Sequence, residues 1–168
     1  LQYCYDDGLI SKRDDWKYLR VQLSGNTFEY NIANNLYFDK VERGFRPHKY
    51  LGLYTKKSIR AVGKIVARII AVDNGEGLKY RGDGLGKITE ERKKAIEQAI
   101  EHEKEFGYDI RTREHRYFFV EQFYETDFRK VSLRAPRGSR VFDLTQILET
   151  DVIPDDVSKI AETLKNKT

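Results

Sequence analysis

The sequence predicts an α+β fold in which a mostly antiparallel, barrel-like β-sheet is interrupted by inserted helices. Segments with strand-like alternation outnumber segments with helical spacing along the chain, an order typical of this class. With 168 residues, we expect a single domain, residues 1–168, with a sizeable core. Hydrophobic residues make up 39% and charged residues 35% of the chain, a balance that excludes a disordered protein.

The first predicted strands lie on either side of a short turn. Apolar residues alternate with others over residues 16–23, and residues 24–27 read Ser-Gly-Asn-Thr, which is typical of a turn. Alternation resumes over residues 28–32. We therefore expect a β-hairpin here.

The middle of the chain predicts two further strands. Residues 50–54 are a short aromatic and aliphatic run. Residues 59–72 fit an amphipathic helix by their apolar spacing, but they are rich in β-branched residues and include Gly63. We favour a strand, because an extended segment precedes them and a glycine-rich segment follows.

The clearest predicted helix lies at about residues 89–106, after a loop. Five glycines between residues 75 and 86 predict that loop. Thr89 can cap the helix, Glu90 suits its positive first turn, and Gly107 can end it. Apolar residues are spaced along one face, while most other positions are charged.

The last third of the chain predicts two strands and two helices. Residues 117–124 form the strongest strand pattern, with residues 128–133 as the expected hairpin partner. Residues 135–139 read as a turn. A short helix over residues 144–148 and a terminal helix over residues 157–164 complete the prediction.

Positive charge is concentrated in two windows that contain no acidic residue. Residues 43–72 carry eight Lys/Arg, and residues 128–142 carry five. These windows hold 13 of the 31 basic residues, which leaves 18 basic residues beside 27 acidic ones elsewhere. Such segregation produces a local positive field, and its usual partner is anionic.

We expect both windows to contact the phosphates of a nucleic acid. The planar guanidinium of Arg can donate two parallel hydrogen bonds to a phosphate. Aromatic and basic residues are interleaved over residues 43–49, as in sites for single strands and flipped bases. The Lys-Lys pair at residues 56–57 predicts a tight turn. For each of these groups of basic residues, the alternative is that they form only a solvated surface. The predicted nucleic-acid-binding residues are Arg43, Arg46, Lys49, Lys56, Lys57, Arg129, Lys130, Arg134, Arg137 and Arg140.

Aromatic side chains are candidates for base stacking, which contributes roughly 1–3 kcal/mol per base. The alternative is that they fill the core. Core packing is favoured for Tyr54, which lies in an apolar run, and less so for Trp16, which has charged neighbours. The base-stacking candidates are Trp16, Phe45 and Tyr54.

The sequence lacks a recognised catalytic motif. The glycines at 75–86 have neither dinucleotide-binding nor P-loop spacing, and Asp83 would repel a phosphate there. A metal-dependent nuclease of the restriction type is an alternative function, with Asp109 and Glu121 as catalytic carboxylates. Such nucleases place a Lys two residues after the second acid, where this chain has Phe123. The leading interpretation has no catalytic residue.

We expect no metal and no cofactor. The histidines His48, His102 and His115 are scattered, and Cys4 has no companion, whereas zinc requires clustered ligands. A single cysteine excludes a disulfide within the chain and favours a reducing, cytoplasmic location. No apolar run reaches the roughly 18 residues of a membrane span, so we expect no membrane partner.

The chain starts at Leu1 and contains no Met. We expect it to be a fragment or a processed chain of a larger protein. A fused or partner effector domain would then carry any further activity.

The segment at residues 49–65, which reads KYLGLYTKKSIRAVGKI, resembles a strand-turn-strand piece of the PUA-like barrels, the superfamily of the EVE, ASCH and YTH domains. The resemblance would cover residues 45–134. It implies binding of RNA or of a modified DNA base in an aromatic pocket flanked by basic residues. It also implies a setting in restriction or antiviral defence, since some such domains are the recognition parts of modification-dependent restriction systems.

These observations predict a non-catalytic domain that binds DNA or RNA and recognises a modified or flipped base. Besides the nuclease, a third interpretation is a protein-interaction module whose basic face meets an acidic partner. It predicts that nucleic acids bind no better than another polyanion of equal charge.

Overall fold

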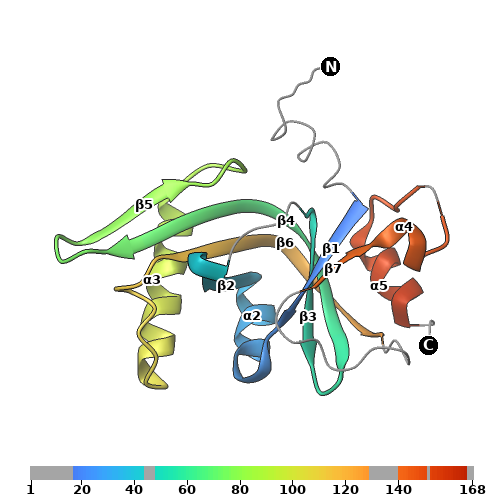
Figure 1. Ribbon diagram of the computed structural model, residues 1–168, viewed down its shortest axis with the longest axis horizontal. Coiled ribbons are helices and arrows are strands. Elements are labelled where there is room, and N and C mark those ends of the chain that lie inside the picture. The colour runs from blue at the N-terminus through green and yellow to red at the C-terminus, as the bar shows by residue number, and fades with distance from the viewer. Residues whose placement is uncertain (1–16, 44–47, 129–139, 151, 166–168) are drawn as a thin grey trace. The chain divides into compact units, whose positions relative to one another are not determined.

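The computed structural model describes residues 17–43, 48–128, 140–150 and 152–165 (Figure 1). Short 3-10 turns, η2 (Gly25–Thr27) and η3 (Val41–Arg43), join some of its elements. The strands are β1 (Tyr18–Leu23), β2 (Leu36–Lys40), β3 (Tyr50–Thr55), β4 (Ser58–Asp73), β5 (Leu78–Gly82), β6 (His115–Phe128) and β7 (Arg140–Asp143). The helices are α2 (Phe28–Asn34), α3 (Glu90–Glu105), α4 (Leu144–Ile147) and α5 (Val157–Lys165).

The strands form one mixed sheet in the order β2-β6-β4-β3-β1-β7, with β5 paired to β4. β1 and β3 run parallel, whereas β3–β4, β4–β5, β2–β6 and β1–β7 are antiparallel. The predicted α+β class with a mostly antiparallel sheet is confirmed. Within the described strands the sheet is open, because its order has two ends, β2 and β7.

The chain divides into two compact units that share its two longest strands. The first unit comprises Leu1–Ile32, Arg46–Lys64 and Glu121–Thr168. The second unit comprises Ala33–Phe45 and Ile65–Val120. Each unit takes one part of β4 and one part of β6. The single domain expected from the length stays a prediction.

The first unit is built on a core between its strands and its C-terminal helices. Leu19 and Val21 of β1 are 0% and 2% exposed and belong to one cluster with Val62 of β4. α5 adds Ile160 and Leu164, whose four-residue spacing places them on one face of the helix. The predicted helices at the end of the chain are confirmed, and Asp143 caps α4 by accepting a hydrogen bond from the Thr145 amide at 2.9 Å.

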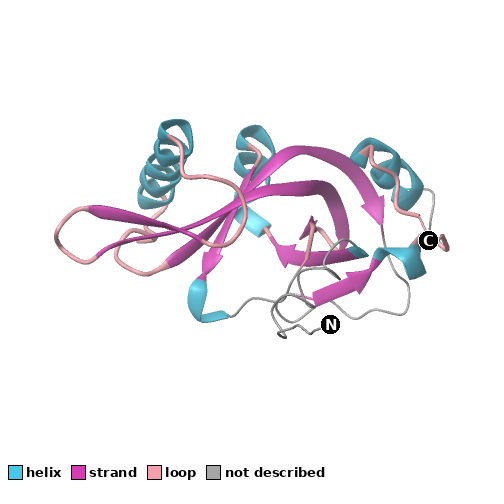
Figure 2. Ribbon diagram, turned by 90° about the horizontal axis from the view of Figure 1, so that it is seen from above, coloured by secondary structure: helices cyan, strands magenta, loops and turns pink. Residues whose placement is uncertain are grey.

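The second unit pairs α3 with the far end of β4. Figures 1 and 2 show α3 on one face of the β4–β5 ribbon. Ile96 and Ala99 of α3 are fully buried. Thr89 caps the helix through the Arg92 amide, and Gly107 follows its C-terminus with φ +85°. The predicted helix at residues 89–106 is confirmed.

Two predicted elements differ in the structure. Residues 28–32 form α2 and not a strand: the Thr27 hydroxyl hydrogen-bonds the Ser24 carbonyl, which tightens η2 into a helical entry. Phe28 and Ile32 are four residues apart, so they suit a helix face as well as an alternating strand. β1 therefore pairs with β3 and β7 and forms no hairpin with its successor.

The glycine-rich segment is also more regular than predicted. Within residues 75–86, the stretch Leu78–Gly82 is strand β5, paired with the end of β4. The strand favoured at residues 59–72 is confirmed by β4, and the strand at residues 117–124 by β6. The hairpin expected between residues 117–124 and 128–133 is wrong at its start, because β6 continues without a turn to Phe128. Residues 129–133 and the turn expected at residues 135–139 lie outside the described residues.

Candidate nucleic-acid interface

Only part of the predicted interface is described by the structure. The described side chains are Lys49, Lys56, Lys57 and Tyr54, all in the first unit. Arg43 and Arg140 are placed in η3 and β7 without a description of their side chains. The remaining predicted residues, Trp16, Phe45, Arg46, Arg129, Lys130, Arg134 and Arg137, lie outside the described residues, and their roles stay predictions.

Lys56 and Lys57 form the two-residue turn of the β3–β4 hairpin, as predicted. Thr55 pairs with Ser58 across the turn. The φ angles of Lys56 and Lys57 are +51° and +66°, so both lie in the left-handed region, as a type I′ turn requires. Both side chains are exposed. The turn therefore presents two adjacent ammonium groups to solvent.

This turn is costly for its residue types. Type I′ turns favour Asn-Gly, because side chains with an ordinary Cβ lose roughly 1–2 kcal/mol in the left-handed region. Neighbouring like charges add repulsion. Strained conformations of this kind cluster at functional sites, which makes the pair a candidate contact for an anion.

We expect Lys56→Asn/Lys57→Gly to raise the free energy of unfolding by about 1–2 kcal/mol, because both replacements relieve the backbone strain. Urea denaturation followed by circular dichroism measures the change. Lys56→Ala/Lys57→Ala is the control, since it removes the same charges and keeps the strained backbone. If both variants have the same stability, strain in the turn is not the cause.

A pocket of about 430 Å³ opens beside this turn. Its walls come from three segments of the first unit: α2 with the turn before it, the β3–β4 hairpin, and β6. The hairpin provides Lys56 and Arg60, α2 provides Phe28 and Glu29, and β6 provides Glu125. Basic and acidic groups therefore face one cavity beside the exposed lysines.

Arg60 keeps unused hydrogen-bonding capacity in this pocket. Its Nη1 lies 3.9 Å from Asp127 Oδ2, at the outer limit of an ion pair. Its Nε is buried and has no hydrogen-bond partner. A partly exposed, long pair of this kind contributes at most about 1 kcal/mol, so the guanidinium can bind an incoming anion with little loss.

The other two described candidates, Lys49 and Tyr54, contact side chains of the first unit. Lys49 Nζ lies 5.9 Å from the centroid of the Tyr50 ring, within the range of a cation–π interaction. Tyr50 is 4% exposed, and burial together with Asp155 raises the pKa of its hydroxyl. Tyr54 is partly buried and packs against the core of the first unit. Base stacking by Tyr54 stays a prediction.

The two carboxylates of the nuclease alternative fall in different units. Asp109 accepts hydrogen bonds from the Thr112 hydroxyl and from the amides of Thr112 and Arg111, and these bonds lower the pKa of its carboxyl group. Glu121 is exposed on β6. Within the described part of the chain, no group of three His, Cys, Asp or Glu side chains could hold a metal ion.

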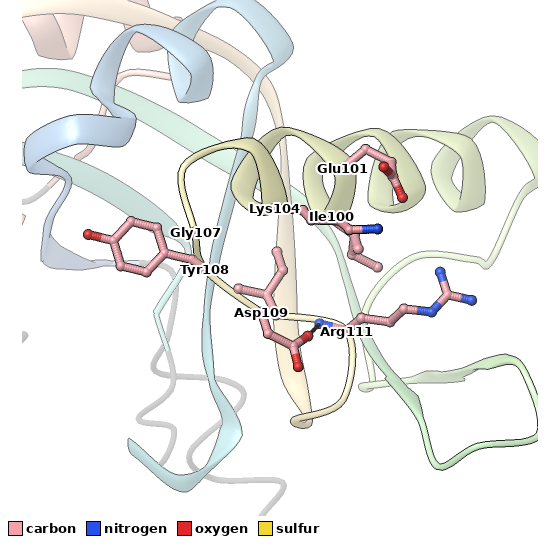
Figure 3. Close-up of a pocket in the computed structure, with 8 residues that line it drawn as sticks. Ile100, Glu101, Lys104, Gly107, Tyr108, Asp109 and Arg111 are labelled. Carbon is pink, nitrogen blue, oxygen red and sulfur yellow. Dashed lines mark hydrogen bonds between the residues drawn. The ribbon is translucent and has the colours of Figure 1, made fainter.

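A second pocket, of about 530 Å³, lies in the second unit between the end of α3 and residues 107–111 (Figure 3). Ile100 and Ile110, 3% and 7% exposed, line it together with charged side chains of both signs. Arg111 is held by Asp73, with Nε 2.8 Å from Oδ2. This surface lacks the excess of positive charge that the hairpin has.

The sequence identified the basic hairpin but not its pocket. The acidic wall was missed, because Glu29 and Glu125 belong to the acid-containing parts of the chain. No local pattern joins α2 to β6; only the pairing of the strands brings them to one cavity.

None of the helices among the described residues is both long and apolar enough to cross a bilayer.

No protein-family model matches the chain, and a search of curated proteins gives no match either. Among solved structures, the chain is similar to a mutant ZmASCH protein from Zymomonas mobilis. The two share 14% identity at a TM-score of 0.46, over 80% of this chain and 96% of that one. ASCH proteins are among the PUA-like families named above, and membership of this chain in that superfamily stays a prediction.

Proposed function

We propose that the chain is a non-catalytic nucleic-acid-binding domain and that the β3–β4 hairpin of the first unit is part of its interface. The observation that supports the proposal best is the strained, exposed Lys56-Lys57 turn within a window of 30 residues that contains no acid. Arg60 adds a partly exposed guanidinium, whose ion pair with Asp127 is long at 3.9 Å. This arrangement offers cations to a phosphate backbone.

Binding of this kind would be driven largely by the release of counterions. The logarithm of the binding constant then falls linearly with the logarithm of the salt concentration, and we call the steepness of this line the salt slope. Each phosphate neutralised by a Lys or Arg increases the salt slope by about 0.9 for a duplex and 0.7 for a single strand. These contacts position the nucleic acid without reading its sequence. Specificity requires a contact to a base, and the pocket beside the turn has room for an unstacked one.

We expect Lys56→Ala/Lys57→Ala to weaken binding about ten-fold at physiological salt. We also expect it to reduce the salt slope by the amount that about two phosphate contacts contribute. Fluorescence anisotropy with labelled single- and double-stranded DNA and RNA, across a salt series, measures both quantities. Lys87→Ala/Lys94→Ala is the matched control, because it removes two exposed lysines of the second unit.

An equal loss in both variants would mean that net charge, and not the hairpin, governs binding. Absence of binding at low salt would overturn the proposal. Heparin at matched charge serves as competitor: if it competes as well as nucleic acid does, the protein-interaction alternative is favoured. Recognition of a modified base, and a setting in restriction or antiviral defence, stay predictions.

A further inference from the structure

The pocket beside the Lys56-Lys57 turn contains opposite charges that do not neutralise one another. Lys56 and Arg60 line it together with Glu29 and Glu125. The side chains of the two glutamates and of Lys56 form no hydrogen bond or ion pair with another described residue. Because Lys56, Glu29 and Glu125 are exposed, these basic and acidic groups are available to a ligand that enters the pocket.

The arrangement suits a ligand with an anionic group at one end and N–H donors at the other. An anion would meet Lys56 and the partly exposed guanidinium of Arg60, both of which line the pocket. A carboxylate accepts hydrogen bonds only, so Glu29 and Glu125 select a donor-rich group. Phe28 adds an apolar wall. At about 430 Å³, the pocket falls in the usual size range of small-molecule sites.

We propose that this pocket holds one unstacked nucleotide of the bound strand and prefers guanine. Its phosphate would lie at Lys56 and Arg60, and its base would meet the two glutamates. Guanine presents two neighbouring donors, N1–H and the N2 amino group, which match the two oxygens of a carboxylate. On this edge adenine and cytosine offer one amino group, and uracil and thymine offer one N3–H, so none of them presents two neighbouring donor groups. The inference rests on the proposed function, because the lysines beside the pocket bring the strand to it.

The test compares single-stranded oligonucleotides of about eight nucleotides, a usual site size, in DNA and RNA. One series is all pyrimidine, a second carries one central guanine, and a third carries inosine, which lacks the N2 amino group. We expect the wild type to bind the guanine series about ten-fold more tightly than the inosine series, as a bidentate contact requires.

The variant Glu29→Gln/Glu125→Gln should lose this preference and keep the salt slope of the wild type. Glu121→Gln is the matched control, because Glu121 is exposed on the same strand as Glu125 but does not line the pocket. It should keep the preference. Equal affinity of the wild type for all three series, or a preference that survives in the double variant, would overturn the inference while salt-dependent binding sustains the proposed function. If no oligonucleotide binds, both fail.

Discussion

Replacing Asp83 with Asn should lower the free energy of unfolding by about 3 kcal/mol, because two buried arginines share its carboxylate. Arg116 Nε lies 2.7 Å and Arg68 Nε 3.4 Å from Asp83 Oδ2, and Arg68 Nη2 donates to the Asp83 carbonyl at 3.0 Å. The side chains of Arg68 and Arg116 are only 9% and 10% exposed. Asn would keep the shape and remove the charge, so two guanidinium groups with little access to water would lose the carboxylate that they share.

Urea denaturation followed by circular dichroism tests this expectation. Glu114→Gln is the control, because Glu114 forms a comparably short pair, 2.7 Å to Arg81, whose side chains are 39% and 59% exposed. An exposed pair contributes under about 1 kcal/mol. Equal losses of stability in the two variants would show that burial does not strengthen the Asp83 ion pairs. The Asp83 cluster, which consists of Asp83, Arg68 and Arg116, would then contribute no more than ion pairs on the surface.

The behaviour of Asp83 shows where sequence reasoning fell short. From the sequence alone, Asp83 in the glycine-rich segment predicts only repulsion of a phosphate. Its partners lie 15 and 33 positions away. Arg68 meets it because β4 pairs with β5, and Arg116 comes from β6, the neighbour of β4 in the sheet. Local patterns locate strands, but long-range pairing decides which charges become neighbours.

The dependence on long-range pairing also explains why some elements could be predicted from the sequence and others could not. Elements with one strong period, such as α3 and β6, were predicted because local propensity and burial agree there. Residues 28–32 fit both periods, and a buried Asn31 that hydrogen-bonds the Thr27 hydroxyl at 2.9 Å fits the helical entry. For the candidate site, counting charges identified the basic turn, whereas the acidic wall of its pocket depends on the position of β6 beside β4.

Gly86→Ala should be among the most destabilising single substitutions in the described chain, with an expected loss of about 3 kcal/mol or more. A Cβ at this position would lie 2.4 Å from the Cβ of Ala67 and 2.8 Å from the carbonyl oxygen of Val66. The φ of Gly86 is +72°, which adds roughly 1–2 kcal/mol for a residue with a side chain. Relief requires the loop to leave β4.

That movement would reach the Asp83 cluster. The Arg68 amide donates to the Leu85 carbonyl at 3.0 Å, and the Asp83 amide donates to the Arg68 carbonyl at 3.3 Å. Both bonds hold the loop against β4, so a displaced Gly86 would also withdraw the Asp83 carboxylate from Arg68. We therefore expect Gly86→Ala and Asp83→Asn to be strongly non-additive when combined, with a double variant little worse than the worse single one.

Gly75→Ala separates the cost of steric overlap from the cost of the backbone conformation. Gly75 also has a positive φ, +104°, but a Cβ there would meet no atom within 4 Å. Its substitution should cost only the conformational penalty of roughly 1–2 kcal/mol. Denaturation midpoints of the two variants, measured side by side, give the contribution of close packing by difference. If Gly75→Ala is as destabilising as Gly86→Ala, backbone conformation alone explains both, and the close approach of the loop to β4 does not contribute to stability.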